Sequence, residues 1–154
     1  MDFKLSCRMM LEYIFIFILW TLVLYLIHRL IHITPVLKEL HWDHHKYVNL
    51  NDTGWRFNNL LLFNDTWKST VDLWITEVIP SLIFSIVTGH YWVIVFYYIW
   101  AAFLQEELEH NKKINFYPFT AGQWHLVHHR TPNKNFGLFL PFWDKIFRTE
   151  KLMP

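Results

Sequence analysis

The apolar residues of this chain come in long blocks rather than at the period of an amphipathic helix or strand. The first block, Met9–Ile27, contains one charged residue, Glu12, and neither glycine nor proline. Extended to His32, it is long enough to cross a bilayer as a helix that rises about 1.5 Å per residue. Lys4 and Arg8 precede it as in a signal peptide, but no small-residue cleavage site follows, so we expect a retained membrane helix.

A proline is expected to end this first helix. Pro35 cannot continue it, but suits the first turn of a new helix with Thr34 as its cap. This second helix is expected to run from Val36 to about Tyr47. The stretch that follows, Asn49–Asn64, is polar and rich in turn-forming residues, which predicts irregular structure at the surface.

A second apolar block covers Val71–Leu104. Its 34 residues include only two carboxylates and one histidine as ionisable interruptions. This block is too long for one span and predicts two helices of roughly 17 residues each, with a break near Gly89. Pro80 is expected to kink the first of them, which membrane helices tolerate.

The chain becomes polar and aromatic after Gln105, and no further span follows. We therefore predict an all-α integral membrane bundle of about three transmembrane helices, with a histidine-rich helical cap outside the bilayer. Residues 1–154 are expected to form a single membrane-embedded domain.

The distribution of charge indicates which side carries the cap. Three spans place 12 of the 14 lysines and arginines in residues 28–70 and 105–154, on one side of the membrane. By the positive-inside rule that side is cytoplasmic. The formal net charge of +1 gives no reason to expect a nucleic-acid partner.

The single cysteine, Cys7, excludes an internal disulfide and a cysteine-based metal site. A metal would have to be held by imidazole, and nine of the ten histidines fall into a few tight clusters on the side predicted to be cytoplasmic. These nine are His28, His32, His41, His44, His45, His110, His125, His128 and His129.

The spacing of these histidines suits a two-metal site. Residues four apart, such as His28 and His32, lie on the same face of a helix. Each of the two HxxHH sequences likewise places three rings on one face, so that one pair can hold one metal while the third ring reaches a second. Nine imidazoles are too many for one ion and about right for two. The plain alternative is a set of interfacial histidines without metal.

Two further residues, His90 and Glu106, are ionisable and lie outside the nine clustered histidines. His90, in Gly89-His90-Tyr91, lies on the opposite face of the membrane and is expected to be a turn residue. Glu106 shares a helical face with His110, as a metal ligand or as a residue that orients one. Solvation at the helix end is the simpler role for Glu106.

Taken together, the motifs HRLIH, HWDHH, LEHN, WHLVHH, NFG and WDKIFRT resemble the fatty acid hydroxylase/sterol desaturase superfamily of membrane di-iron oxygenases, over about residues 20–149. The resemblance implies that all nine clustered histidines bind two metal ions, iron in the active enzyme and zinc in some isolated forms. Asn135 and Asp144 are expected to hold the last histidine box in place. The chain departs from the family where Glu106 replaces a histidine of some members, and where Asn58-Asn59 and Arg148 alter family motifs.

The resemblance implies hydroxylation or desaturation of a lipid (a sterol, fatty acyl chain or sphingolipid) with O2 as co-substrate. Attack on an unactivated C–H bond is beyond amino-acid side chains, so a metal must carry it out. No heme- or flavin-binding segment is visible, which implies a separate electron donor of cytochrome b5, ferredoxin or reductase type. The membrane would be the endoplasmic reticulum in a eukaryote and the inner membrane in a bacterium.

Two other functions use the same residues. A zinc-loaded site would make the protein a lipid hydrolase or isomerase, because zinc activates water and has no redox chemistry. A non-catalytic member would bind metal or lipid only. The aromatic residues of the spans are expected either to admit a lipid chain from the bilayer or to serve as interfacial and packing residues: Trp74, Trp92, Tyr97, Tyr98 and Trp100.

Overall fold

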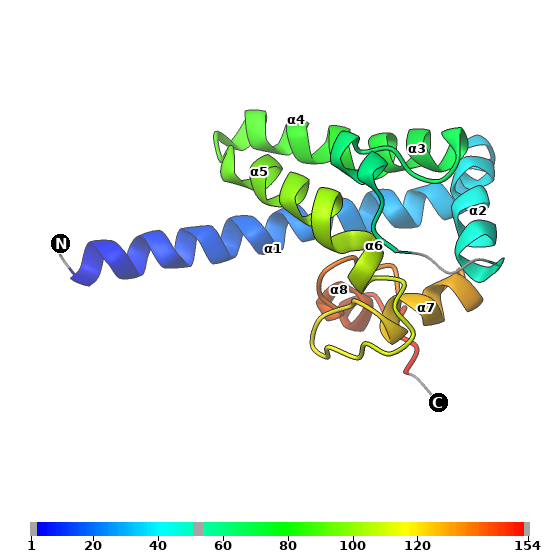
Figure 1. Ribbon diagram of the computed structural model, residues 1–154. Helices are drawn as coiled ribbons and strands as arrows, with labels where there is room; N and C mark the ends of the chain where they lie inside the picture. The colour runs from blue at the N-terminus through cyan, green and yellow to red at the C-terminus, as the bar shows by residue number, and fades with distance from the viewer. Residues whose placement is uncertain (1–2, 51–53, 153–154) are drawn as a thin grey trace.

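The computed structural model describes residues 3–50 and 54–152, and every regular element in these ranges is a helix (Figure 1). Helix α1, Phe3–Ile33, is the longest, and its first turns extend beyond the rest of the molecule. The predicted break at Pro35 is confirmed: α2, Pro35–Leu50, starts there and crosses the end of α1. The Thr34 hydroxyl donates to the Leu30 carbonyl oxygen (2.9 Å) at this corner.

The second apolar block forms a helical hairpin. Its first arm runs from Trp67 to Thr88 as α3 (Trp67–Leu73), a π-helical turn η2 (Trp74–Val78) and α4 (Ile79–Thr88). The predicted break is confirmed, since α4 ends at Gly89 in a left-handed conformation (φ 72°). The second arm comprises α5 (Trp92–Ile99), the π-helical turn η3 (Trp100–Leu104) and α6 (Gln105–Leu108).

The irregularity expected at Pro80 takes the form of the π-helical turn that precedes it. Pro80 has no amide hydrogen, and its ring would clash with the carbonyl group four residues earlier in a regular α-helix. The widened turn η2, in which the Ile79 amide donates to the Trp74 carbonyl oxygen, removes that conflict.

Two helices are long and apolar enough to cross a membrane, Ser6–Ile33 and Trp67–Thr88. Large apolar side chains of α1 and α4 point outward, among them Phe15, Ile83 and Val87, the last of which is 78% exposed. Such faces suit lipid rather than water. The second arm of the hairpin, Trp92–Leu108, corresponds to the third predicted span but is shorter, so a total of three spans stays a prediction.

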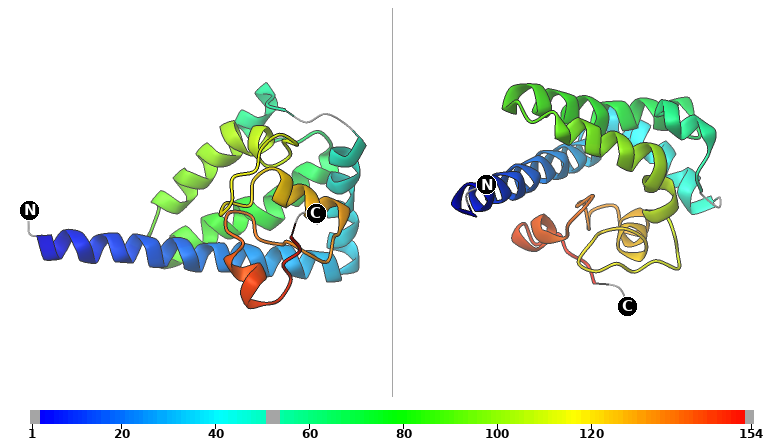
Figure 2. Two further views of the ribbon diagram at one scale, coloured as in Figure 1. Left: turned by 90° about the horizontal axis from the view of Figure 1, so that it is seen from below. Right: turned by 60° about the vertical axis from the view of Figure 1, so that its left-hand side comes forward.

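Helix α1 lies between the hairpin and the C-terminal region (Figures 1 and 2). Its fully buried Trp20 donates from the indole nitrogen to the Ser81 hydroxyl (3.0 Å) on the hairpin side. On the other side the Tyr25 and Thr149 hydroxyls form a buried hydrogen bond (2.8 Å). The core of the molecule is therefore assembled around the middle of α1.

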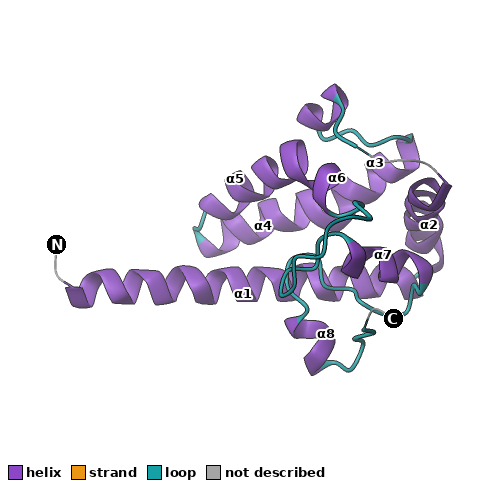
Figure 3. Ribbon diagram, turned by 60° about the horizontal axis from the view of Figure 1, so that its bottom comes forward, coloured by secondary structure: helices purple, strands orange, loops and turns teal. Residues whose placement is uncertain are grey.

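The C-terminal region, residues 109–152, is built mostly of loops around two short helices, α7 (Gln123–Arg130) and α8 (Phe142–Ile146) (Figure 3). It packs on the C-terminal half of α1 and beside α2. The stretch predicted to be irregular before the hairpin includes residues 51–53, which lie outside the described residues. The remainder forms the end of α2, a short 3-10 helix η1 (Phe57–Leu61) and turns.

Candidate metal centre

Three helices, α1, α2 and α7, and the turn after α6 bring the nine clustered histidines together in two adjacent groups. In each group, one candidate ligand atom from every residue lies within 4.8 Å of those of the others. The five-histidine group comprises His28, His32, His41, His45 and His128. The four-histidine group comprises His44, His110, His125 and His129.

Both HxxHH boxes are divided between the two groups. In α2, His41 and His45 belong to the five-histidine group and His44 to the four-histidine group. In α7 the assignment is reversed, since His128 alone joins the five-histidine group. One pair therefore serves one group while the third ring reaches the other, as the spacing predicts.

Distances within the groups match those between neighbouring ligands of a metal ion. The Nε2 atoms of His41 and His28 are 3.1 Å apart, and those of His41 and His45 are 3.0 Å apart. In the other group, the Nε2 atoms of His125 and His129 are 3.0 Å apart. Two nitrogens bonded at about 2.1 Å and at a right angle to one ion are separated by about 3.0 Å. The rings are thus placed as ligands of a shared ion would be.

The outer nitrogens of several rings are anchored, which fixes their tautomers. His41 Nδ1 donates to Asp72 Oδ2 (2.8 Å), and His28 Nδ1 donates to the Phe136 carbonyl oxygen (2.8 Å). His128 Nδ1 donates to a backbone carbonyl oxygen at residue 134 (2.7 Å). A proton on Nδ1 leaves the lone pair of Nε2 directed inward, the arrangement found around metal-bound histidines.

Glu106 supplies the corresponding contact in the four-histidine group. Its Oε2 lies 3.3 Å from His110 Nδ1, and its side chain is only 11% exposed. Simple solvation at the helix end, the role favoured from the sequence, is therefore wrong, and Glu106 orients His110. The Nε2 atom of His110 is buried and has no hydrogen-bond partner among the described residues.

Asn135 and Asp144, from the NFG and WDKIFRT motifs, hold the loop whose carbonyl oxygens at Lys134 and Phe136 accept from the histidines. Asp144 is fully buried, and its carboxylate accepts hydrogen bonds from the amides of Phe136 (2.8 Å) and Gly137 (2.9 Å). Because the Phe136 carbonyl oxygen accepts from His28, Asp144 supports the first box. Asn135 donates to the Trp124 carbonyl oxygen (3.3 Å), directly before the last box, which it was expected to hold in place. Asp144 was expected to hold the same box, but its contact with Phe136 leads to His28 of the first box.

The electrostatics of the site favour neutral imidazoles. Burial lowers the pKa values of His41, His45, His125, His128 and His129 well below the usual 6.5. Burial and the neighbouring His110 lower the pKa of His44 to about 4. Neutral rings with lone pairs are the form that binds iron, zinc and other transition metals. The residues present therefore fit two metal ions held by nitrogen.

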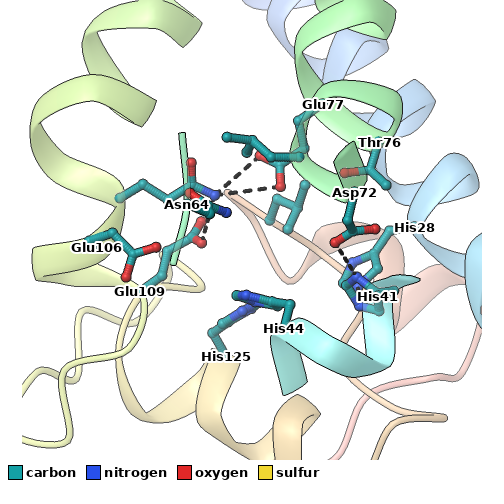
Figure 4. Close-up of a pocket in the computed structure, with 13 residues that line it drawn as sticks. His28, His41, His44, Asn64, Asp72, Thr76, Glu77, Glu106, Glu109 and His125 are labelled. Carbon is teal, nitrogen blue, oxygen red and sulfur yellow. Dashed lines mark hydrogen bonds and ion pairs between the residues drawn. The ribbon is translucent and has the colours of Figure 1, made fainter. Parts of the chain in front are cut away.

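A small cavity of about 20 Å³ adjoins both groups (Figure 4), with room for about one water molecule. Its lining includes histidines of both groups and the carboxylates of Asp72, Glu77, Glu106 and Glu109. Gln105 Nε2 links two of them, lying 3.3 Å from Glu77 Oε2 and 3.1 Å from Glu109 Oε2. The roles of Asp72, Glu77 and Gln105 were missed from the sequence, although acidic residues inside an apolar helix are a recognisable signal.

The other singled-out residues belong to neither histidine group. His90 belongs to neither group and pairs with Glu12 (3.4 Å). Of the five aromatic residues expected to admit lipid or to pack, Tyr97 is fully buried and donates to Glu77 (3.2 Å). Trp100 packs on Phe139, with ring centroids 5.1 Å apart. Trp74 and Tyr98 donate to backbone carbonyl oxygens of the turn region before the hairpin, and Trp92 packs on the ring of Tyr13.

The fold and the site define an all-helical protein with two adjacent groups of buried and half-buried histidines, each suited to a transition-metal ion. The chain belongs to the fatty acid hydroxylase family: the family model described as fatty acid hydroxylase matches residues 13–149. This places it in the fatty acid hydroxylase/sterol desaturase superfamily. Searches of curated proteins and of solved structures found no match. The family and the two apolar helices indicate a membrane protein that is a lipid-modifying oxygenase.

Proposed function

We propose that this chain is a membrane-bound di-iron oxygenase that hydroxylates or desaturates a lipid with O2 and electrons from a separate donor. The observation that carries the proposal is the crosswise division of the two HxxHH boxes between two adjacent histidine groups. A single metal or a structural histidine cluster would not require each box to serve both groups.

Iron would supply the activation of O2, which side chains cannot perform. Hydroxylation consumes one O2, two electrons and two protons, and yields the alcohol and one water. The chain's own residues position the ligands: Asp72 orients His41, and Glu106 orients His110. The surrounding helices and the C-terminal region exclude bulk water, as the burial of both groups requires.

The side of the membrane and the electron donor are part of the same proposal. The lysines and arginines around the histidine groups support a site facing the cytoplasm, where a small electron carrier of cytochrome b5, ferredoxin or reductase type would reach it.

The proposal is tested by profiling the lipids of cells that express the chain under ¹⁸O2. Label in a lipid hydroxyl group, or new double bonds without label, is the expected result. His128→Ala, which removes the one α7 ligand of the five-histidine group, should abolish either product. His90→Ala is the matched control, because His90 lies outside both groups and should leave the products unchanged.

The metal content of the purified protein separates the alternatives. Two iron ions per chain together with an oxidised lipid support the oxygenase. Two zinc ions that sustain turnover, with hydrolysed or isomerised lipid and no dependence on O2, would establish the zinc enzyme instead. Unchanged lipids with both metals bound, a reductant present and a range of sterols, acyl lipids and sphingolipids supplied would indicate a non-catalytic member.

A further inference from the structure

An apolar groove of about 290 Å³ lies beside the metal centre, between α1, the second arm of the hairpin and the C-terminal region. Its walls include Phe17, Phe96, Trp100, Phe119, Leu138 and Phe139. Phe17 belongs to a helix apolar enough to cross a membrane. A lipid in the bilayer can therefore meet the groove without passing through water.

Leu138 separates this groove from the metal centre. It lines the groove, and it also lines the small cavity that His28, His41, His44 and His125 face. Leu138 is thus the residue common to both spaces. Its side chain is only 8% exposed.

The backbone at this point is held in place. The preceding residue, Gly137, donates its amide hydrogen to Asp144 Oδ2 (2.9 Å). A Cβ atom on Gly137 would lie only 2.5 Å from the Leu140 carbonyl oxygen, so the loop is closely packed. Leu138 therefore forms a wall of defined position rather than a mobile flap.

We propose that the groove receives a single aliphatic chain of the lipid substrate, and that Leu138 determines which carbon of that chain is presented to the metal centre. This inference rests on the proposed oxygenase function. The walls are almost entirely carbon, so a carboxylate, phosphate or other polar group buried against them would lose its hydrogen bonds to water without gaining a partner. The polar headgroup accordingly stays outside the groove.

The size and surroundings of the groove favour an aliphatic chain over a whole lipid. Its volume is at the lower end of the range for ligand pockets, about 300–1,000 Å³. The loop beside it carries Phe116 and Phe119, which are 56% and 55% exposed and also line the groove. Exposed aromatic side chains of this kind suit the membrane interface, where a lipid chain would enter.

A second, larger groove is the rival route. It lies at the corner between α1 and α2 and reaches His32, but its lining carries Arg29, Lys38 and Glu39. These charges suit water or a polar headgroup rather than a hydrocarbon chain. The apolar groove at Leu138 is therefore the better path for the reacting part of the substrate.

Photo-crosslinking tests occupancy of the groove independently of turnover. The metal-loaded full chain in phosphatidylcholine nanodiscs would be irradiated with a phospholipid that carries a diazirine on a saturated acyl chain. Adducts are expected on peptides containing residues 96–100, 116–119 and 138–139. Leu138→Trp should reduce those adducts several-fold, since the indole would fill the inner end. Adducts confined to the Arg29–Glu39 corner would overturn the proposal.

The position of oxidation tests the role of Leu138 in the reaction. Leu138→Ala should shift the oxidised position along the chain, and Leu138→Phe should lower turnover severalfold with both metals retained. Because Leu138 is in the core, Leu138→Met, which nearly conserves volume, provides a variant expected to fold, with a changed product ratio. The matched control, Leu82→Ala, alters a 44% exposed leucine on α4 and should change nothing.

The outcomes distinguish this inference from the function on which it rests. Wild-type oxidation with unchanged product position in all folded Leu138 variants would refute the role of Leu138 and leave the oxygenase intact. If the wild type oxidises no lipid but holds both metals, the oxygenase proposal fails, and the role of Leu138 in positioning fails with it. Groove adducts would then show only a lipid-binding site.

Discussion

Asp72 offers the sharpest test of the two-group arrangement. It lies on α3, inside a helix apolar enough to cross a membrane, and contacts His41 through a 2.8 Å hydrogen bond. The side chains of both residues are less than a tenth exposed, at 8% and 9%, so that solvent does not weaken the contact. His41 in turn lies 3.1 Å from His28 and 3.0 Å from His45, at the centre of the five-histidine group.

Removing such a partner typically weakens metal binding about 10- to 100-fold, or about 1.4–2.8 kcal/mol. For Asp72→Ala we expect the upper end, because the His41 N–H would be left buried without an acceptor. Asp72→Asn keeps an acceptor but loses the charge, and should cost about tenfold. Only the five-histidine group contacts Asp72 directly, so one of the two ions should become labile.

The assay is metal content per chain after equilibration with increasing chelator. The wild type should release its ions at high chelator, whereas Asp72→Ala should release one ion at about 100-fold lower chelator and retain the other. Glu39→Gln is the matched control on the neighbouring helix: it also removes a carboxylate, but that residue is exposed and pairs with Lys68 (3.0 Å). Both ions held at wild-type strength in Asp72→Ala would refute the reasoning, as would simultaneous loss of both from a folded protein.

Three further changes test the surroundings of the site. Gly137→Ala places a Cβ 2.5 Å from a backbone carbonyl oxygen, so it should lower the free energy of unfolding by about 1–3 kcal/mol and weaken metal retention, as measured by thermal unfolding and metal content. Gly89→Ala is its control. The added Cβ meets nothing within 4 Å, so this variant should lose only about 1 kcal/mol through backbone strain and keep its metal. Glu106→Ala should lower the chelator concentration that releases the ion held by His110 by about tenfold. Its effect on metal binding should add to that of a change at Asp72. Because the folded pKa of His44 is about 4, protons should compete with metal only as the pH falls toward that value; metal loss centred on pH 6.5 in dialysis at fixed free metal would contradict this.

The sequence predicted the elements well where one physical signal dominated. The long apolar blocks, the proline at the first corner and the glycine at the hairpin each determine local structure without help from distant residues. The break at Pro35 and the turn at Gly89 therefore appear where they were predicted. The form of the irregularity at Pro80 was not predictable, since a kink and a π-helical turn resolve the same steric conflict.

The sequence could predict that each HxxHH box would be divided between two metals, but not which histidines of different boxes would share a group. Helical spacing relates the rings within one box, whereas the grouping depends on how α2 and α7 face each other. The same limit applies to Asp72. Its sequence position shows a carboxylate inside an apolar helix, but its contact with His41 is set by packing between α3 and α2. The contact of Glu106 with His110 is local, because the two residues are four apart, and the sequence offered it as one of the roles of Glu106.

The crosswise grouping follows from the geometry of HxxHH once two such helices are brought together. Successive residues of an α-helix are about 100° apart, so the first and last histidines of a box differ by about 40° and form a pair. The middle ligand, His44 or His128, is about 100° from the last and points to the side of that pair. When two boxes meet, the pair of each faces the single ring of the other, and two separate groups form. Neither group is complete without α7, so metal binding should stabilise the docking of the C-terminal region on α1 and α2.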